Sequence, residues 1–280
     1  MRPIHILYIA LTILTFTGCN DISEEERFSA EPVAFTPKKN ILIEDFTGQN
    51  CLNCPNAAEA VHAIQNLYGE DHVIAVAIHG GELKLPIPYG NPQQLATEEG
   101  DHWNTMWGVE EWPNGMIDRI EGLRPYTAWS AAAVNRLQKE TPLTLAVELL
   151  DDDASSLQSD SITLRVTAQA TDPCEGYINL WLTEDSIVAV QRMPDGSMNT
   201  AYVHNHVFRT ALTPANGETL SVEAGEEREL LFGLRLPEAW KRENLRPIVF
   251  FESAKSGDGI LQAARGGVLE TCNRRITKNN

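Results

Sequence analysis

Two cysteines, Cys51 and Cys54, constrain this chain most, because they stand between segments of different periodicity. The apolar run 41–46 before them predicts a buried strand, and a segment with helical spacing begins at about Asn56. A helix N-terminus stabilises a thiolate. We therefore predict a strand that delivers both cysteines to the first turn of a helix, with one thiol nucleophilic and exposed.

The following segments extend this pattern into an α/β unit. The helix should end at Tyr68, because Gly69 is a natural C-terminal stop. The apolar run 72–79 is typical of a buried parallel strand, so strand, helix and strand form a crossover unit. Residues 93–107 and 126–140 predict two further helices, whereas an edge strand near 120–123 should be short or missing.

These residues resemble the thioredoxin fold. Asp45 and Phe46 end the strand before the cysteines, and Pro113 follows two elements later, where that fold has a cis-proline opening the strand that faces the site. The resemblance implies a cis bond between Trp112 and Pro113. Asn50 stands where tryptophan is usual, and Leu-Asn replaces Gly-Pro between the cysteines, so the redox potential does not follow from the resemblance.

Asp45 is the predicted proton acceptor of this site. In a strand over 41–46 its carboxylate shares a face with Ile41 and Ile43 and points into apolar surroundings beneath the cysteines. Burial should raise its pKa, which suits an acceptor for the proton of the resolving thiol, Cys54.

Beyond Pro142 the apolar period changes to two. Alternation over 143–149, 162–168 and 230–236, with apolar runs at 178–182 and 248–251, predicts several antiparallel strands. Such a pattern is typical of an immunoglobulin-like sandwich, which is a binding or spacing architecture. We expect a thioredoxin-like α/β domain over 39–141 and an all-β sandwich over 142–280.

The N-terminus predicts export and lipidation. Residues 1–18 contain a short apolar core, too short for a membrane span, and read as a signal peptide. The sequence Thr-Gly-Cys that follows resembles a bacterial lipobox, which implies acylation of Cys19. The alternative is an ordinary cleaved signal with Cys19 incidental. Residues 19–38 are acidic, contain prolines and predict a flexible tether.

A second resemblance covers nearly the whole chain. It rests on the residues from Ile43 to Pro55, on Tyr68-Gly69 and Ile78-His79, and on the segments 113–119 and 202–209. Together they resemble the outer membrane protein 28 family of Gram-negative lipoproteins. That family implies a thioredoxin-like domain followed by a β-domain, anchored to the outer membrane and facing the periplasm or the cell surface, with redox and adhesin roles both suggested.

Charge excludes one class of partner. The formal net charge of −17 opposes binding to nucleic acid, and the sequence has no basic run and no phosphate loop. We expect no cofactor. If residues 202–208 form a strand, His204 and His206 point to the same side and could form a metal cluster with Glu184 and Asp185, but hydrogen-bonded structural histidines are the better interpretation.

Two other sets of residues allow alternative interpretations. Trp103, Trp107 and Trp112 could form a peptide-binding surface, although a role in covering the core is favoured. Cys174 and Cys272 remain as an even pair, so we expect a disulfide between them, with two buried free thiols as the alternative.

Two hypotheses about function follow. In the first, the protein is a thiol-disulfide oxidoreductase acting on protein thiols or disulfides: Cys51 attacks, Cys54 resolves, Asp45 accepts the proton and Pro113 presents its backbone to an extended peptide. In the second, it is a surface binding protein or adhesin, and Cys51–Cys54 is a structural disulfide. In both, lipid on Cys19 anchors the chain to the membrane.

Overall fold

Strand β1 (Ile41–Thr47) is buried along its whole length. This computed structural model describes residues 35–150 and 161–269. Helix α2 (Cys54–Tyr68) follows β1 and ends before Gly69, whose φ of 90° suits a glycine. Strand β2 (Val73–His79) then pairs with β1 in parallel, as predicted for a crossover unit.

The chain continues through a helix and a second pair of strands. The 3₁₀ turn η1 (Gly81–Leu83) leads to α3 (Glu98–Met106), which starts later than predicted because Thr97 caps it by accepting from the Gly100 amide. Strand β3 (Asn114–Ile117) runs antiparallel to β1, and β4 (Ile120–Arg124) pairs with β3. Thus the edge strand is present. After η2 (Tyr126–Ala128), helix α4 spans Trp129–Leu137.

The second half of the described chain is almost entirely β. Its elements are β5 (Leu143–Leu150), β6 (Ser161–Ala170), β7 (Cys174–Glu184), β8 (Ile187–Arg192), β9 (Met198–His204), β10 (Val207–Ala211), β11 (Glu218–Val222), β12 (Glu227–Arg235), η3 (Arg242–Asn244), β13 (Leu245–Ser253) and β14 (Ile260–Arg265). The fold is therefore mostly β, with helices gathered in the first half.

Strands from both halves share one mixed sheet, whose order is β14-β13-β7-β10-β2-β1-β3-β4, with β11 also paired to β7. The halves join where β10 pairs in parallel with β2 at Val207 and Ala77, and the Ala77 amide donates to the His206 carbonyl. The predicted boundary at 141 and 142 lies between α4 and β5, and the sheet continues from one half into the other.

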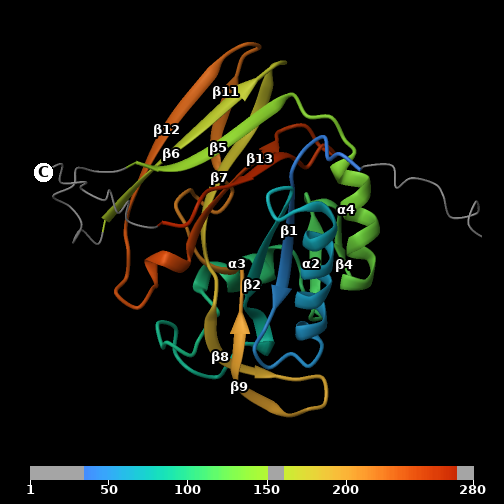
Figure 1. Cartoon of the computed structure of the whole chain (residues 1–280), viewed down its shortest axis with the longest axis vertical. Coiled ribbons are helices and arrows are strands. Elements are labelled where there is room, and N and C mark those ends of the chain that lie inside the picture. The colour runs from blue at the N-terminus through green and yellow to red at the C-terminus, as the bar shows by residue number, and fades with distance from the viewer. Residues whose placement is uncertain (1–34, 151–160, 270–280) are drawn as a thin grey trace, which may run out of the picture. The chain divides into compact units, whose positions relative to one another are not determined.

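Helices cover β1 and its neighbours, which explains why these strands read as continuous apolar runs. Helices α2 and α4 lie side by side near β1 (Figure 1). The opposite set of β1 side chains, including Leu42 and Phe46, packs into an aromatic core with Trp103 of α3 and Trp181 of β7. The rings of Trp103 and Trp181 stack with centroids 4.4 Å apart.

A buried ion pair crosses this core. Arg119 follows β3 and donates two hydrogen bonds, of 3.0 and 2.8 Å, to the carboxylate of Glu44 on β1 and one of 2.5 Å to Glu252 on β13. Its guanidinium also lies 5.1 Å from the ring centroid of Phe250. These carboxylates hold the pKa of Arg119 above its usual value despite burial.

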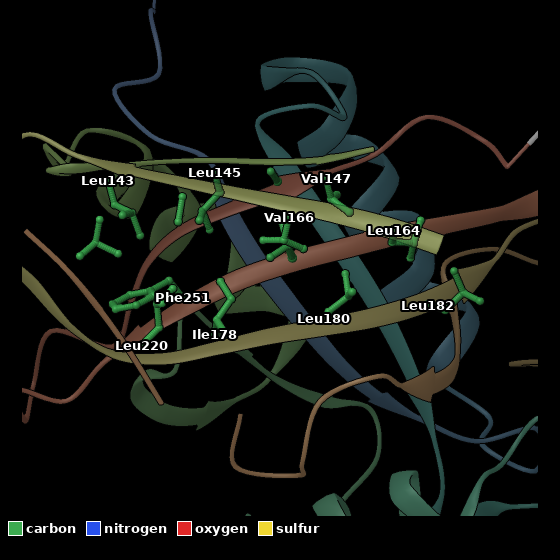
Figure 2. Close-up of a cluster of buried hydrophobic side chains, with 14 of the residues drawn as sticks. Leu143, Leu145, Val147, Leu164, Val166, Ile178, Leu180, Leu182, Leu220 and Phe251 are labelled. Carbon is green, nitrogen blue, oxygen red and sulfur yellow. The ribbon is translucent and has the colours of Figure 1, made fainter. Parts of the chain in front are cut away.

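The remaining strands make a second layer. Strands β12, β6 and β5 form a three-stranded antiparallel sheet, with the alternating burial expected of strands that have one face on a core. Figure 2 shows that Leu145 and Val166 of this sheet face Leu180 and Phe251 of the large sheet, within one cluster of buried side chains. Two packed β layers thus fill this part of the molecule.

Candidate functional site

Cys51 and Cys54 lie between the end of β1 and the start of α2, as the sequence predicted, and they form a disulfide. The turn between them and β1 is held by the Cys51 amide, which donates to the Gly48 carbonyl at 3.0 Å. A Cβ at Gly48 would lie 2.7 Å from the Leu83 carbonyl oxygen, so glycine is required there. Cys54 opens the helix and is followed by Pro55, which suits a first helical turn.

The disulfide is buried, so the prediction of an exposed thiol is wrong for this oxidised structure. Cys51 is 1% exposed and Cys54 is 3% exposed. The hairpin of β8 and β9, far along the chain, reaches this site: Gln191 Nε2 donates to the Cys51 carbonyl at 2.9 Å. The amide of Arg192 donates to the Gln49 carbonyl at 2.8 Å.

Gln49 ties three segments together beside the disulfide. Its side chain is fully buried, and Nε2 donates at 2.9 Å to the carbonyls of both Gln93 and Val190. Its Oε1 accepts from the Leu95 amide at 3.1 Å. Sequence reasoning missed this residue and Gln191, because a glutamine in a polar loop carries no signal of burial.

Asp45 is buried beneath this turn, as predicted from strand alternation. It is 4% exposed, and its Oδ1 has no hydrogen-bond partner. Burial raises its pKa to about 8. A carboxyl group with that pKa is mostly protonated at neutral pH and can exchange its proton near that pH.

The Trp112–Pro113 peptide bond is cis, as the resemblance to thioredoxin implied. In the pairing of β3 with β1, Asn114 lies opposite Phe46. Pro113 therefore lies just before the Asn114–Phe46 pair, which is near the end of β1. From that end the chain continues to Cys51.

A cavity of about 570 Å³ opens beside the disulfide, between α2, β2 and the hairpin. Cys54 and Asp45 line it together with His79 of β2 and His204 of β9. The two imidazole centroids are 5.4 Å apart. Its floor is therefore built by residues from both halves of the chain.

His79 and His204, the two buried histidines of this cavity, have lowered pKa values. Burial and the neighbouring His204 and Arg209 lower the pKa of His79 well below its usual value. Burial lowers the pKa of His204 to about 4, although backbone carbonyls partly offset it. His79 Nδ1 and His204 Nε2 have no hydrogen-bond partner. In the sequence His79 ends an apolar run and contributes to the family resemblance, but neither feature indicates its place in this site.

The metal cluster weighed from the sequence does not form. Strand β9 ends at His204, and His206 has a φ of 56°, so the two histidines do not share a strand face. His206 instead pairs with Asp185 at 3.2 Å, and Glu184 accepts from Arg209 at 2.7 Å. Within residues 35–150 and 161–269, no group of three His, Cys, Asp or Glu side chains could hold a metal ion.

Trp103, Trp107 and Trp112 cover the core, which is the interpretation that the sequence favoured over a peptide-binding surface. Trp103 is buried, and Trp107 packs against the same cluster, beneath Arg119. Trp112 Nε1 donates to Asn104 Oδ1 at 2.9 Å.

The other cysteines are only partly described. Cys174 is buried and has no disulfide partner within residues 35–150 and 161–269; burial and Asp172 raise the pKa of its thiol. Its expected partner Cys272 lies outside the described residues, as does Cys19, so both the disulfide and the lipidation stay predictions. In the part of the chain that the structure describes, no helix has the length and apolar character needed to cross a membrane.

Comparison with known proteins gives structural and family relationships. No curated protein matches the chain. HBP35 of Porphyromonas gingivalis has a similar fold, with a TM-score of 0.65 and 15% identity over 88% of this chain and 80% of that chain. A domain of the outer membrane lipoprotein Omp28 from the same organism matches 46% of this chain and 88% of its own length, with 14% identity and a TM-score of 0.32.

A family profile also matches the chain. The profile of the outer membrane protein Omp28 family matches residues 100–270, more than half of the chain and most of its β half. The predicted outer-membrane location agrees with that family. The chain therefore belongs to the Omp28 family of outer membrane proteins.

Proposed function

We propose that this outer membrane protein exchanges thiols and disulfides with proteins of the cell envelope at Cys51–Cys54. In this proposal residues 39–141 are a thioredoxin-like domain, and residues 142–280 are an immunoglobulin-like sandwich. The crossover of β1, α2 and β2 and the cis bond before β3 support the first assignment. The two packed β layers support the second. Lipid on Cys19 holds the protein at the membrane.

The observation that carries this proposal is the buried carboxyl group of Asp45. Burying a carboxyl group without a hydrogen-bond partner costs free energy, and a structural disulfide gains nothing from it. Here Asp45 lines the same cavity as Cys54, and its pKa is raised to about 8. Such a group is suited to accept a proton from the resolving thiol near neutral pH.

The chemistry proceeds in two displacements. The thiolate of Cys51 attacks a substrate disulfide, forms a mixed disulfide and releases one substrate sulfur as a thiolate. Cys54 then loses its proton to ionised Asp45 and attacks the Cys51 sulfur. The second substrate sulfur leaves, and the Cys51–Cys54 bond forms, so the substrate is reduced and the protein is oxidised. The reverse sequence oxidises a substrate dithiol.

Access to Cys51 requires motion in this proposal. Since Cys51 is 1% exposed, the segments packed around it, the hairpin of β8 and β9 among them, must move before a protein disulfide can reach its sulfur. The hydrogen bond from Gln191 to the Cys51 carbonyl is one contact that this opening would break.

The test is the reduction potential of the pair. The protein is equilibrated in glutathione buffers of graded ratio, quenched with an alkylating agent, and the oxidised fraction of Cys51–Cys54 is measured. We expect a potential above about −300 mV, where exchange with cellular thiols is possible. A lower potential, with no mixed disulfide trapped by a Cys54→Ser variant, would contradict the proposal.

A second candidate function has its own supporting observation. Because both cysteines are buried, the pair could be a structural disulfide in a surface binding protein or adhesin. That function predicts the low potential just described. It also predicts that Asp45→Asn leaves the rate of disulfide reduction unchanged, whereas the exchange proposal predicts a slower rate.

A further inference from the structure

The cavity beside the disulfide reaches only one of its two sulfur-bearing residues. Cys54 lines the cavity, and Cys51 does not. Cys51 is also nearly without exposure, and Gln191 holds its carbonyl. A reagent that enters the cavity therefore meets Cys54 first. In the site predicted from the sequence, by contrast, Cys51 is the reactive cysteine.

The cavity has a buried polar floor and an open rim. Asp45, His79 and His204 form part of the floor, and each has a buried oxygen or nitrogen atom without a partner. At the rim, Ala58 and Glu59 on α2 are exposed. Unpaired buried polar atoms are costly, so a site that contains three of them is suited to a ligand that brings hydrogen-bond donors and acceptors.

The size of the cavity limits this ligand. A volume of about 570 Å³ lies within the range of small-molecule sites and is too small for a folded protein. The buried floor groups are neutral at neutral pH, because burial raises the pKa of Asp45 and lowers those of His79 and His204. These three groups therefore offer hydrogen bonds without charge, and charged side chains enter the lining elsewhere, namely Glu59, Glu70, Asp185, Glu243 and Arg246.

We propose that the cavity binds a small polar thiol, of amino-acid or short-peptide size, which exchanges with the disulfide at Cys54. This inference rests on the proposed exchange function and names a substrate for the same site. Small thiols would thus set the redox state of the pair through the cavity, without opening of the hairpin over Cys51.

Reduction of the Cys51–Cys54 disulfide consumes two thiol molecules. The first thiolate attacks the Cys54 sulfur, the Cys51–Cys54 bond breaks, and Cys51 leaves as a thiolate that takes a proton from solvent. The second thiolate attacks the ligand sulfur of the mixed disulfide. Cys54 then leaves and takes a proton from Asp45, which solvent restores. Two thiols are oxidised to one disulfide, and the protein pair is reduced.

The experiment identifies the sulfur that is attacked in the full-length oxidised protein. The protein is exposed briefly to 2-mercaptoethanol and quenched with N-ethylmaleimide, and its peptides are mapped by mass spectrometry. We expect mercaptoethanol on Cys54 and maleimide on Cys51, in excess over the opposite pattern by about tenfold or more. The opposite pattern would overturn the inference and leave exchange at the pair standing.

Matched variants of α2 test the route. Ala58→Trp places a large side chain at the rim, whereas Ala63→Trp changes another exposed residue of the same helix that does not line the cavity. We expect the first variant to slow reduction by 2-mercaptoethanol severalfold and the second to leave the rate unchanged. Equal rates would overturn the inference. If the folded wild-type protein resists reduction entirely but is reduced in urea, the proposed function fails as well.

Discussion

Replacing Asp45 by asparagine should change the pH dependence of stability. The pKa of Asp45 is 3.8 in an ordinary setting and about 8 in the folded protein. Below pH 3.8 both states are protonated, so burial of the charge carries no penalty. Between these values the unfolded chain ionises and the folded chain does not, so stability falls as pH rises, until the loss is complete above about pH 8.

The magnitude follows from the two pKa values. Each pH unit costs about 1.4 kcal/mol, so Asp45 lowers the free energy of unfolding by about 4 kcal/mol at pH 7. Asparagine does not ionise and avoids this loss, but its amide brings a buried N–H that costs about 1–3 kcal/mol without a partner. Asp45→Asn should therefore destabilise the protein near pH 4 and stabilise it at pH 7 and above.

The assay is urea unfolding of the oxidised protein, followed by tryptophan fluorescence at several values between pH 4 and pH 8. Glu59→Gln is the matched control, because it makes the same carboxyl-to-amide change at an exposed position on the rim of the same cavity. As a surface substitution it should change the free energy of unfolding by no more than about 0.5 kcal/mol. If the difference between wild type and Asp45→Asn is constant across this range, Asp45 is not a buried acid with a raised pKa, and the basis of the proposed function is lost.

Three further predictions concern other parts of the chain. Gln49→Ala removes three buried hydrogen bonds and should lower the free energy of unfolding in urea by about 2–4 kcal/mol, while making the disulfide easier to reduce; an unchanged value would contradict its role. Arg119→Met leaves the buried carboxylate of Glu44 without a partner and should cost about 3–5 kcal/mol, part of which a second change, Glu44→Gln, should recover. Cys19→Ala should release the protein from membranes on fractionation; retention would show that another anchor is present.

Local patterns were sufficient for much of the first half. The alternation of Ile41 and Ile43 with their neighbours placed Asp45 on a buried face, and Gly69 marked the end of α2. These features depend on side-chain period and on backbone conformation at single residues, both of which can be read over a few positions. The cis bond at Pro113 came from the resemblance to thioredoxin, and the structure confirms it.

The candidate site is built by contacts between residues far apart in the sequence, which local sequence patterns do not predict. Gln191 lies 140 residues from Cys51, yet its hydrogen bond to that residue holds the hairpin against the disulfide. His204 and His206 would share a face only if residues 202–208 formed one strand, but β9 ends at His204, and His204 meets His79 instead. Polar side chains in strands and loops look solvent-exposed in sequence, and only the packing of distant strands buries them.

The sequence by itself determined which chemistry this protein can attempt. The cysteine pair before a helix and the acid within a buried strand are encoded in short stretches whose conformations are set by local physical chemistry, and the resemblance to thioredoxin added the cis-proline. Only the tertiary structure decided access to that chemistry. The pairing of β10 with β2 brings the second half against the first, so that Gln191 of the hairpin bonds the Cys51 carbonyl and a cavity opens at Cys54. Access depends on this long-range packing, which is a property of the whole fold and of no single segment.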